Sequence, residues 1–115
     1  MRADKGATNP ALRGYRERRD AMLKALAETL PDAEVLGIAA GLHAAVRLPA
    51  GDDERAIVEE ADRRGLAIVG LDKYRSRPGS GAPTILINYG RHPPATIRRG
   101  IMELGAVVRA TRRRG

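Results

Sequence analysis

Two clusters of carboxylates are the residues of this sequence whose type and spacing could perform acid–base chemistry. The first lies at residues 52–54 (Asp-Asp-Glu) and the second at residues 59–62, where Glu59, Glu60 and Asp62 are acidic. Paired carboxylates can act as general acid and general base. Helix capping explains the first cluster and a solvated helix face explains the second. No histidine or cysteine lies at ligand spacing beside them, so we predict neither a catalytic residue nor a metal site.

Other polar motifs in the chain have simple structural explanations. Residues 78–81 (Pro-Gly-Ser-Gly) resemble a phosphate-binding loop, but the Gly-Lys-Ser/Thr ending and a following helix are missing, so we expect a flexible connector. His92 stands beside two prolines and is expected in a loop. Because the chain has no cysteine, disulfides, thiolate metal sites and a cysteine nucleophile are excluded.

Arginine is the residue that stands out in the charge balance. The formal net charge is +7, and from Arg98 to Gly115 six arginines face a single Glu. A basic face can bind nucleic-acid phosphates, so a small basic nucleic-acid-binding α/β module is one possible function. The sequence has no aromatic stacking platform and no helix-turn-helix pattern, so charge alone predicts at most weak, nonspecific binding. Arginine-rich solvated helices are the simpler explanation.

The elements that would position these residues follow from hydrophobic periodicity. A chain of 115 residues with 43% hydrophobic residues is typical of one small globular domain. No apolar run approaches membrane-spanning length, so we expect a cytoplasmic protein with no membrane partner. Apolar residues at helical spacing predict a helix from about Ala11 to Pro31 and a last helix opened by Pro93 and Pro94. Residues 1–14 are expected to be a frayed lead-in and residues 111–115 a basic tail.

The middle of the sequence reads as strands around one more helix. Residues 33–39 and 42–49 predict a hairpin around Ala40 and Gly41, and a helix from 51–54 to Gly65 follows. Residues 66–71 predict a strand, and 84–89 (TILINY) predict a central strand covered on both faces. The predicted fold class is therefore α/β (α+β): a two-layer sandwich of about four mainly antiparallel strands with three helices packed on one face.

Several runs in this order carry a resemblance to a known family. They are Tyr15-Arg16-Glu17-Arg18-Arg19-Asp20, Ala40-Gly41-Leu42-His43 leading to Leu48-Pro49, Gly51 with Asp53-Glu54, Ile87-Asn88-Tyr89-Gly90, and Ile97-Arg98-Arg99-Gly100. From about Tyr15 to Val108, the chain resembles the C-terminal small subdomain of MocR-type regulators of the GntR family. Those proteins fuse a DNA-binding winged helix to an aminotransferase-like domain of fold type I that binds pyridoxal phosphate. The resemblance implies an aminotransferase-like subdomain over residues 15–110.

The resemblance also implies what this subdomain would and would not do. The DNA-reading helix, the Schiff-base lysine and the phosphate cup of such a regulator lie upstream of the matching region, so we expect a fragment without activity or cofactor of its own. Pyridoxal phosphate and DNA binding belong to the implied parent. The partner would be the large cofactor-binding domain, or a second copy of the fragment through the apolar surface that this domain would cover. The fragment's sheet would form one wall of the effector cleft, partly lined by Gly41, Leu42, His43 and Tyr74.

Four residues bear on this expectation: Leu86, Lys24, Lys73 and His43. Leu86 aligns where aminotransferases of this fold carry an arginine that binds the substrate carboxylate, which favours sensing over turnover. An imine with pyridoxal phosphate needs a sheltered amine, whereas Lys24 lies on the polar face of a helix and Lys73 in a Pro/Gly loop. We therefore predict that both lysines are solvated. His43 is either a wall residue that contacts an effector or an exposed strand histidine.

Overall fold

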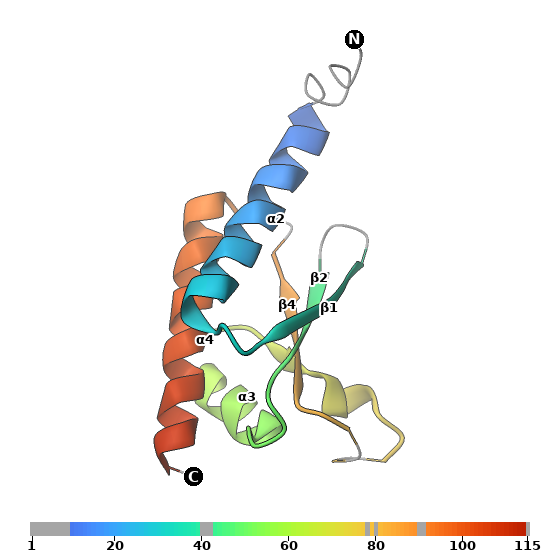
Figure 1. Ribbon diagram of the computed structural model, residues 1–115, viewed down its shortest axis with the longest axis vertical. Coiled ribbons are helices and arrows are strands. Elements are labelled where there is room, and N and C mark those ends of the chain that lie inside the picture. The colour runs from blue at the N-terminus through green and yellow to red at the C-terminus, as the bar shows by residue number, and fades with distance from the viewer. Residues whose placement is uncertain (1–9, 40–42, 78, 80, 90–91, 115) are drawn as a thin grey trace.

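The computed structural model describes residues 10–39, 43–77, 79, 81–89 and 92–114 (Figure 1). They form three α-helices, four strands and a short 3₁₀ helix, in the order α2 (Pro10–Thr29), β1 (Glu34–Ala39), β2 (His43–Arg47), α3 (Glu54–Arg63), β3 (Val69–Gly70), η1 (Leu71–Tyr74), β4 (Thr84–Asn88) and α4 (Pro94–Arg114). The strands make one antiparallel sheet in the order β1-β2-β4-β3. The helices lie on one side of this sheet, which confirms the predicted two-layer fold (Figure 1).

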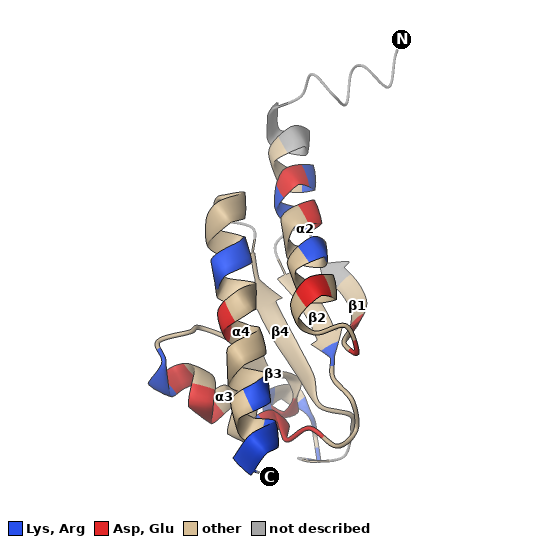
Figure 2. Cartoon of the chain, turned by 60° about the vertical axis from the view of Figure 1, so that its left-hand side comes forward, with Lys and Arg blue, Asp and Glu red and all other residues tan. Residues whose placement is uncertain are grey.

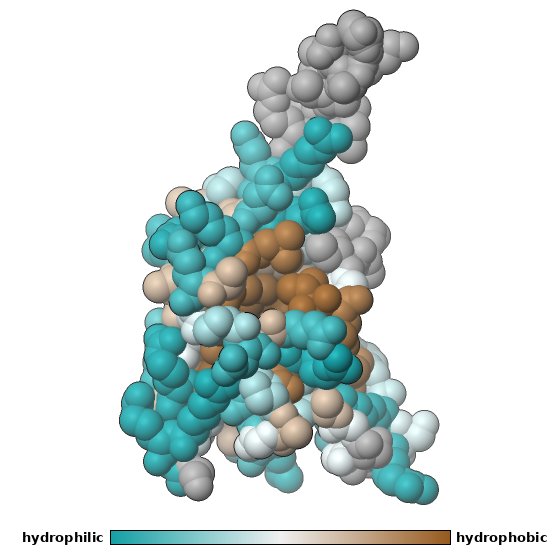
Figure 3. All heavy atoms as spheres, in the orientation of Figure 1, coloured by the Kyte–Doolittle hydropathy of each residue, from teal (hydrophilic) through white to brown (hydrophobic). Residues whose placement is uncertain are grey.

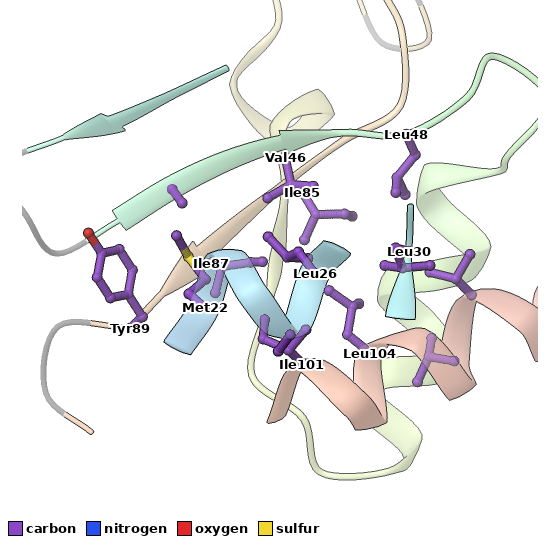
Figure 4. Close-up of a cluster of buried hydrophobic side chains, with 14 of the residues drawn as sticks. Met22, Leu26, Leu30, Val46, Leu48, Ile85, Ile87, Tyr89, Ile101 and Leu104 are labelled. Carbon is purple, nitrogen blue, oxygen red and sulfur yellow. The ribbon is translucent and has the colours of Figure 1, made fainter. Parts of the chain in front are cut away.

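The core lies between the sheet and the two long helices (Figure 4). Met22 and Leu26 of α2 and Leu30, which directly follows the helix, are spaced four residues apart and therefore lie on one side of it. They meet Ala44 and Val46 of β2, Ile85 and Ile87 of β4, and the buried stripe of α4: Ile97, Ile101, Leu104 and Val108. Leu48 closes the core where β2 ends. The core contains one buried aromatic side chain, Tyr89, so most of the apolar area comes from aliphatic residues.

Helices α2 and α4 pack closely against each other at Gly105. A Cβ atom built on Gly105 would lie only 1.8 Å from Cγ2 of Thr29. Thr29 Oγ1 also donates a hydrogen bond to Sδ of Met102, at 2.8 Å. The absence of a side chain at Gly105 therefore lets the two helices pack at this distance.

Local signals define α3 as predicted. The Asp53 carboxylate accepts a hydrogen bond from the Ala56 backbone N–H at 3.1 Å, so Asp53 is the N-cap. After the helix, Gly65 adopts a positive φ of 76°, a conformation that favours glycine. The carboxylates at 53 and 54 therefore shape this segment, and the described residues contain no group of three or more potential metal ligands.

Strand β3 is shorter than the sequence predicted. Instead of a strand over residues 66–71, only Val69 and Gly70 pair with β4, opposite Leu86 and Ile85. The prediction fails at the end of the segment because the Asp72 N–H binds a carboxylate and residues 71–74 turn into the 3₁₀ helix η1. Residues 66–68 precede the paired region and lie beside a pocket described below.

The ends of the chain are more helical than the sequence predicted. Helix α2 begins at Pro10, so residues 10–14 of the expected lead-in are helical, whereas residues 1–9 lie outside the described part. Helix α4 continues to Arg114 through the expected basic tail. Arg112 forms an ion pair with Asp52 and Arg114 with Glu60, so the last turn of α4 is bound to α3 and the residues just before it (Figure 2). No helix in the described ranges combines the length and hydrophobicity that a membrane span needs.

Candidate functional site

The face of the sheet that carries no helix is the first candidate surface. Residues alternate along β2, so Ala44 and Val46 face the core while His43, Ala45 and Arg47 face away. The pairing register places Gly37, Ala45, Leu86 and Val69 opposite one another in a row that crosses all four strands. Because β4 lies between β2 and β3, Leu86 occupies the interior of this row.

This row is apolar and carries no charged side chain. The sequence predicted that residues 84–89 would form a strand covered on both faces. No described helix covers the face of β4 that carries Leu86, and this side chain is half-buried by its neighbours. In the next row, Arg47 pairs with Glu34, so its charge is already balanced. An aliphatic row beside a neutralised arginine suits an apolar group better than a carboxylate.

The predicted cleft-wall residues fall at different places on the sheet. Gly41 and Leu42 lie outside the described residues. His43 is exposed at the start of β2, where it pairs with Asn88. Tyr74 is the last residue of η1, which begins directly after Gly70, the residue of β3 that pairs with Ile85. Ile85 and Asn88 are three residues apart on β4, so the two candidates flank sheet positions that are about 10 Å apart.

Tyr74 is the most exposed large apolar side chain among the described residues, at 65%. The Lys73 ammonium lies 5.9 Å from the centroid of its ring, within the range of a weak cation–π contact. Both described lysines, Lys24 and Lys73, are exposed. Neither has the sheltered environment that covalent attachment of pyridoxal phosphate requires, so the described residues do not fit that role.

The loop that carries Tyr74 is held by a carboxylate that sequence reasoning missed. Glu54 has a side-chain exposure of only 10%. Its Oε2 accepts the Asp72 N–H at 2.6 Å, and its Oε1 accepts the Thr84 N–H at 2.9 Å. A Cβ at Gly70 would lie 2.5 Å from Oε2, so Gly70 leaves the space for this carboxylate. Sequence position gave Glu54 a helix-dipole role only, because its partners lie 18 and 30 residues further along the chain.

Two further groups complete this network. Arg75 Nη1 lies 2.8 Å from Asp72 Oδ1 and 3.4 Å from Glu54 Oε1, and Arg75 Nη2 donates to the Ala82 carbonyl at 2.6 Å. Asp72 Oδ1 also accepts the Gly79 N–H at 2.7 Å. This backbone hydrogen bond, followed by that from Arg75, lowers the pKa of Asp72. The described part of the Pro/Gly-rich segment is therefore tied at several points to α3, β4 and Asp72.

Many arginines that suggested a nucleic-acid surface have carboxylate partners. Arg112 makes two hydrogen bonds of 2.7 Å to Asp52, and Arg98 lies 2.8 Å from Glu28. The Glu60 carboxylate forms ion pairs with Arg63, Arg64 and Arg114. The hydrogen bonds from Arg64 and Arg63 lower the pKa of Glu60 to about 2. Figure 2 shows the basic end of α4 beside the acids of α3. These arginines join helices to one another and leave less positive charge free for phosphates.

Apolar groups also reach the surface beside the edge strand β1. Leu36 is 47% exposed at an irregularity between Val35 and Gly37, and Val35 and Leu23 are partly buried. Figure 3 shows hydrophobic residues gathered in the middle of the face formed by α2 and β1. Exposed apolar patches of this kind are typical of surfaces that contact another protein segment.

Comparisons with known proteins identify the architecture. A scan against protein-family models found no match. Aromatic-amino-acid aminotransferase 1 from Thermococcus litoralis is 32% identical over 96 residues, which are 83% of this chain and 23% of that protein. The multiple substrate aminotransferase from Thermococcus profundus superposes with a TM-score of 0.77 at 30% identity, over 90% of this chain and 26% of that structure. An archaeal alanine:glyoxylate aminotransferase gives a TM-score of 0.72 at 34% identity, over 86% and 24%.

The chain has the fold of the C-terminal portion of an aminotransferase of fold type I. This confirms the aminotransferase-like part of the resemblance, including the implication that full-length relatives use pyridoxal phosphate. The chain spans about a quarter of the length of the aminotransferases that it matches. None of the matches reported above is named as a transcriptional regulator.

Proposed function

We propose that this aminotransferase-like chain forms one wall of a ligand cleft, and that the opposite wall is a domain that holds pyridoxal phosphate. The proposal places the helix-free face of the sheet toward that domain. We further propose that the protein senses an amino compound and does not transaminate it. This corresponds to a regulator of the MocR type, in which DNA binding and cofactor binding lie in other parts of the protein.

Leu86 is the observation that carries the sensing role. It stands in the interior of the row that crosses the sheet, between Ala45 and Val69. Aminotransferases hold the substrate carboxylate with an arginine at the position that Leu86 matches in the resemblance, where two parallel hydrogen bonds form. An aliphatic side chain cannot balance that charge. Arg47, in the neighbouring row, is engaged by Glu34 and offers no replacement.

A cleft wall that binds a ligand without converting it can act as a switch. If the ligand contacts both walls, it stabilises one angle between the two domains and shifts the population of conformations. The chain contributes apolar contacts at Leu86, with His43 and Asn88 at one end of the same face. The readout, affinity for DNA, would belong to another part of the regulator.

The test is a chimera in which this chain replaces the matching C-terminal portion of the Thermococcus litoralis aminotransferase. We expect the chimera to be folded and to show cofactor absorbance, but to transfer the amino group of aromatic amino acids at least 100-fold more slowly than the parent. Leu86→Arg should recover at least tenfold of that loss. Leu36→Arg, which adds the same charge on the edge strand, should recover none. A chimera with Leu86 that transaminates at the parent rate would refute the sensing role.

A titration of the chain itself tests the function independently of the chimera. The paired arginines give less support to the basic nucleic-acid module, so binding to labelled duplex or single-stranded DNA should be weak and should fall steeply with salt. Added pyridoxal phosphate should give no imine absorbance with this chain. Tight nucleic-acid binding that persists at physiological salt would instead favour the module. Sedimentation at several concentrations would show whether the patch around Leu36 drives self-association.

A further inference from the structure

A pocket of about 330 Å³ lies on the other side of β4, away from the proposed cleft wall. It is bounded by three segments: residues 65–68 after α3, residues 87–89 and His92 at and after the end of β4, and the first half of α4. The pocket lies beside the point where the ladder between β3 and β4 ends. Pairing with β4 begins at Val69, the first residue of β3. The preceding segment 66–68 has no strand pairing in the described structure.

The walls of this pocket are apolar and fixed by the core. Ile87, Ile101 and Leu104 are each at most 7% exposed, and they belong to the buried cluster drawn in Figure 4. Leu66 and Ile68 are half-buried on the opposite wall. A pocket lined by side chains that belong to the core is preformed, so a ligand would not have to order them.

The polar groups are confined to a few positions. Asn88, His92 and Thr96 line the pocket, and among its described lining residues there is no Asp, Glu, Lys or Arg. Both backbone polar groups of His92 form hydrogen bonds. Its N–H donates to the Tyr89 carbonyl at 3.4 Å, and its carbonyl accepts from Arg18 Nε at 3.0 Å. These groups can donate to and accept from one neutral hydrogen-bonding group.

Gly100 leaves part of this space open. It lines the pocket from α4, and a Cβ built on it would meet nothing within 4 Å. It stands three residues after Ile97 and four before Leu104, so it shares their side of the helix. Glycine lowers helix stability at an interior position, so no local helical requirement explains Gly100. The open space beside it enlarges the pocket.

We propose that this pocket binds a compact, uncharged, mainly apolar molecule with one hydrogen-bonding group, such as an indole or a phenol. A cavity of about 150 Å³ accommodates benzene, so the volume here is suited to roughly ten non-hydrogen atoms. The ring would lie against Ile87, Ile101 and Leu104, and its polar group would face His92 or Thr96. The site is distinct from the helix-free face, and the proposal does not depend on the function proposed above.

The experiment is an NMR titration of the full chain with indole, followed through backbone amide shifts. Saturable shifts should concentrate at residues 65–68, 87–89 and 96–104, with little change at Ala45 or Leu86. Gly100→Leu places a side chain in the open space and improves helix propensity, so this variant should stay folded and weaken indole binding at least tenfold. Arg99→Leu introduces the same side chain at the adjacent, exposed position. This variant should bind indole with the affinity of the unmodified chain.

Three results would overturn the proposal. The first is no saturable shift up to millimolar indole. The second is binding that Gly100→Leu leaves unchanged, or that maps to the helix-free face. The third is a set of shifts at the same residues that depends on protein concentration alone, which would assign the pocket to a second copy of the chain.

Discussion

Gly105→Ala gives the sharpest test of how the two long helices pack. An added Cβ would lie 1.8 Å from Thr29 Cγ2, whereas ordinary contacts begin near 3.4 Å, so the atoms must separate by about 1.6 Å. Thr29 cannot move away freely, because it is β-branched and its hydroxyl donates to Met102. Either the helices move apart or Thr29 adopts another rotamer and loses that hydrogen bond.

The magnitude follows from a comparison with Gly100→Ala in the same helix. Both substitutions gain about 1 kcal/mol of helix propensity. At Gly100 the new Cβ meets nothing within 4 Å, so the gain should be retained. At Gly105 overpacking costs about 1–3 kcal/mol, so the Gly105 variant should be less stable than the Gly100 variant by that amount.

Urea denaturation followed by circular dichroism at 222 nm measures both variants. The same substitution in a Thr29→Ala background supplies the control, because removing Cγ2 leaves only the longer contacts with Arg109 Nη1, at 3.2 Å, and Thr29 Cβ, at 3.3 Å. The cost of Gly105→Ala should fall by at least half there, and the double-mutant cycle should report this coupling. If Gly105→Ala is as stable as Gly100→Ala, the close approach of α2 and α4 is wrong.

Three more predictions follow from the polar contacts. The pKa of Glu60 is lowered from 4.5 to about 2, so its arginine contacts stabilise the fold above pH 4.5 and lose that effect as the pH falls toward 2. In the Glu60→Gln variant, the midpoint of urea denaturation should therefore depend less on pH between 4.5 and 2. A pH dependence equal to that of the unmodified chain would contradict this prediction. Glu54→Gln should speed hydrogen exchange at the Asp72 and Thr84 amides by at least tenfold, whereas Glu59→Gln, at an exposed position, should not; equal effects would remove the anchoring role of Glu54. Burial raises the pKa of Tyr89 to about 12, so stability should fall as the pH rises from 10 to 12, and Tyr89→Phe should remove the absorbance change at 295 nm near pH 12. Because the Tyr89 hydroxyl is buried without a hydrogen-bond partner among the described residues, this substitution should cost little stability, and a loss above about 2 kcal/mol would mean that the hydroxyl has a partner.

The elements themselves were readable from short-range patterns. Met22, Leu26 and Leu30, like Ile97, Ile101 and Leu104, repeat at the helical period, and the alternation of β2 gives its buried face. Asp53 and Gly65 mark the ends of α3 through local hydrogen bonding and backbone conformation. Such signals depend on residues within a few positions of one another, so a sequence carries them without knowledge of the fold.

The candidate surfaces depended on contacts that only the tertiary structure makes. Placing β4 between β2 and β3 brings Ala45, Leu86 and Val69 into one row, although they are 17 to 41 residues apart in sequence. The same arrangement places His43 opposite Asn88 of β4, whereas Tyr74 follows β3 on the other side of β4. It also buries Glu54 against Asp72 and Thr84, and so turns a helix-capping acid into the anchor of a loop.

The two ends of the chain show the same division. The sequence by itself determined which residues would be apolar, where the helices would have one buried side, and that the C-terminal segment would be basic. The tertiary structure decided that Arg112 would meet Asp52, 60 residues away, and that Gly105 would meet Thr29. Periodicity and capping act over one or two turns of chain, whereas ion pairs and helix crossings depend on the order of strands in the sheet and the packing of the helices on it.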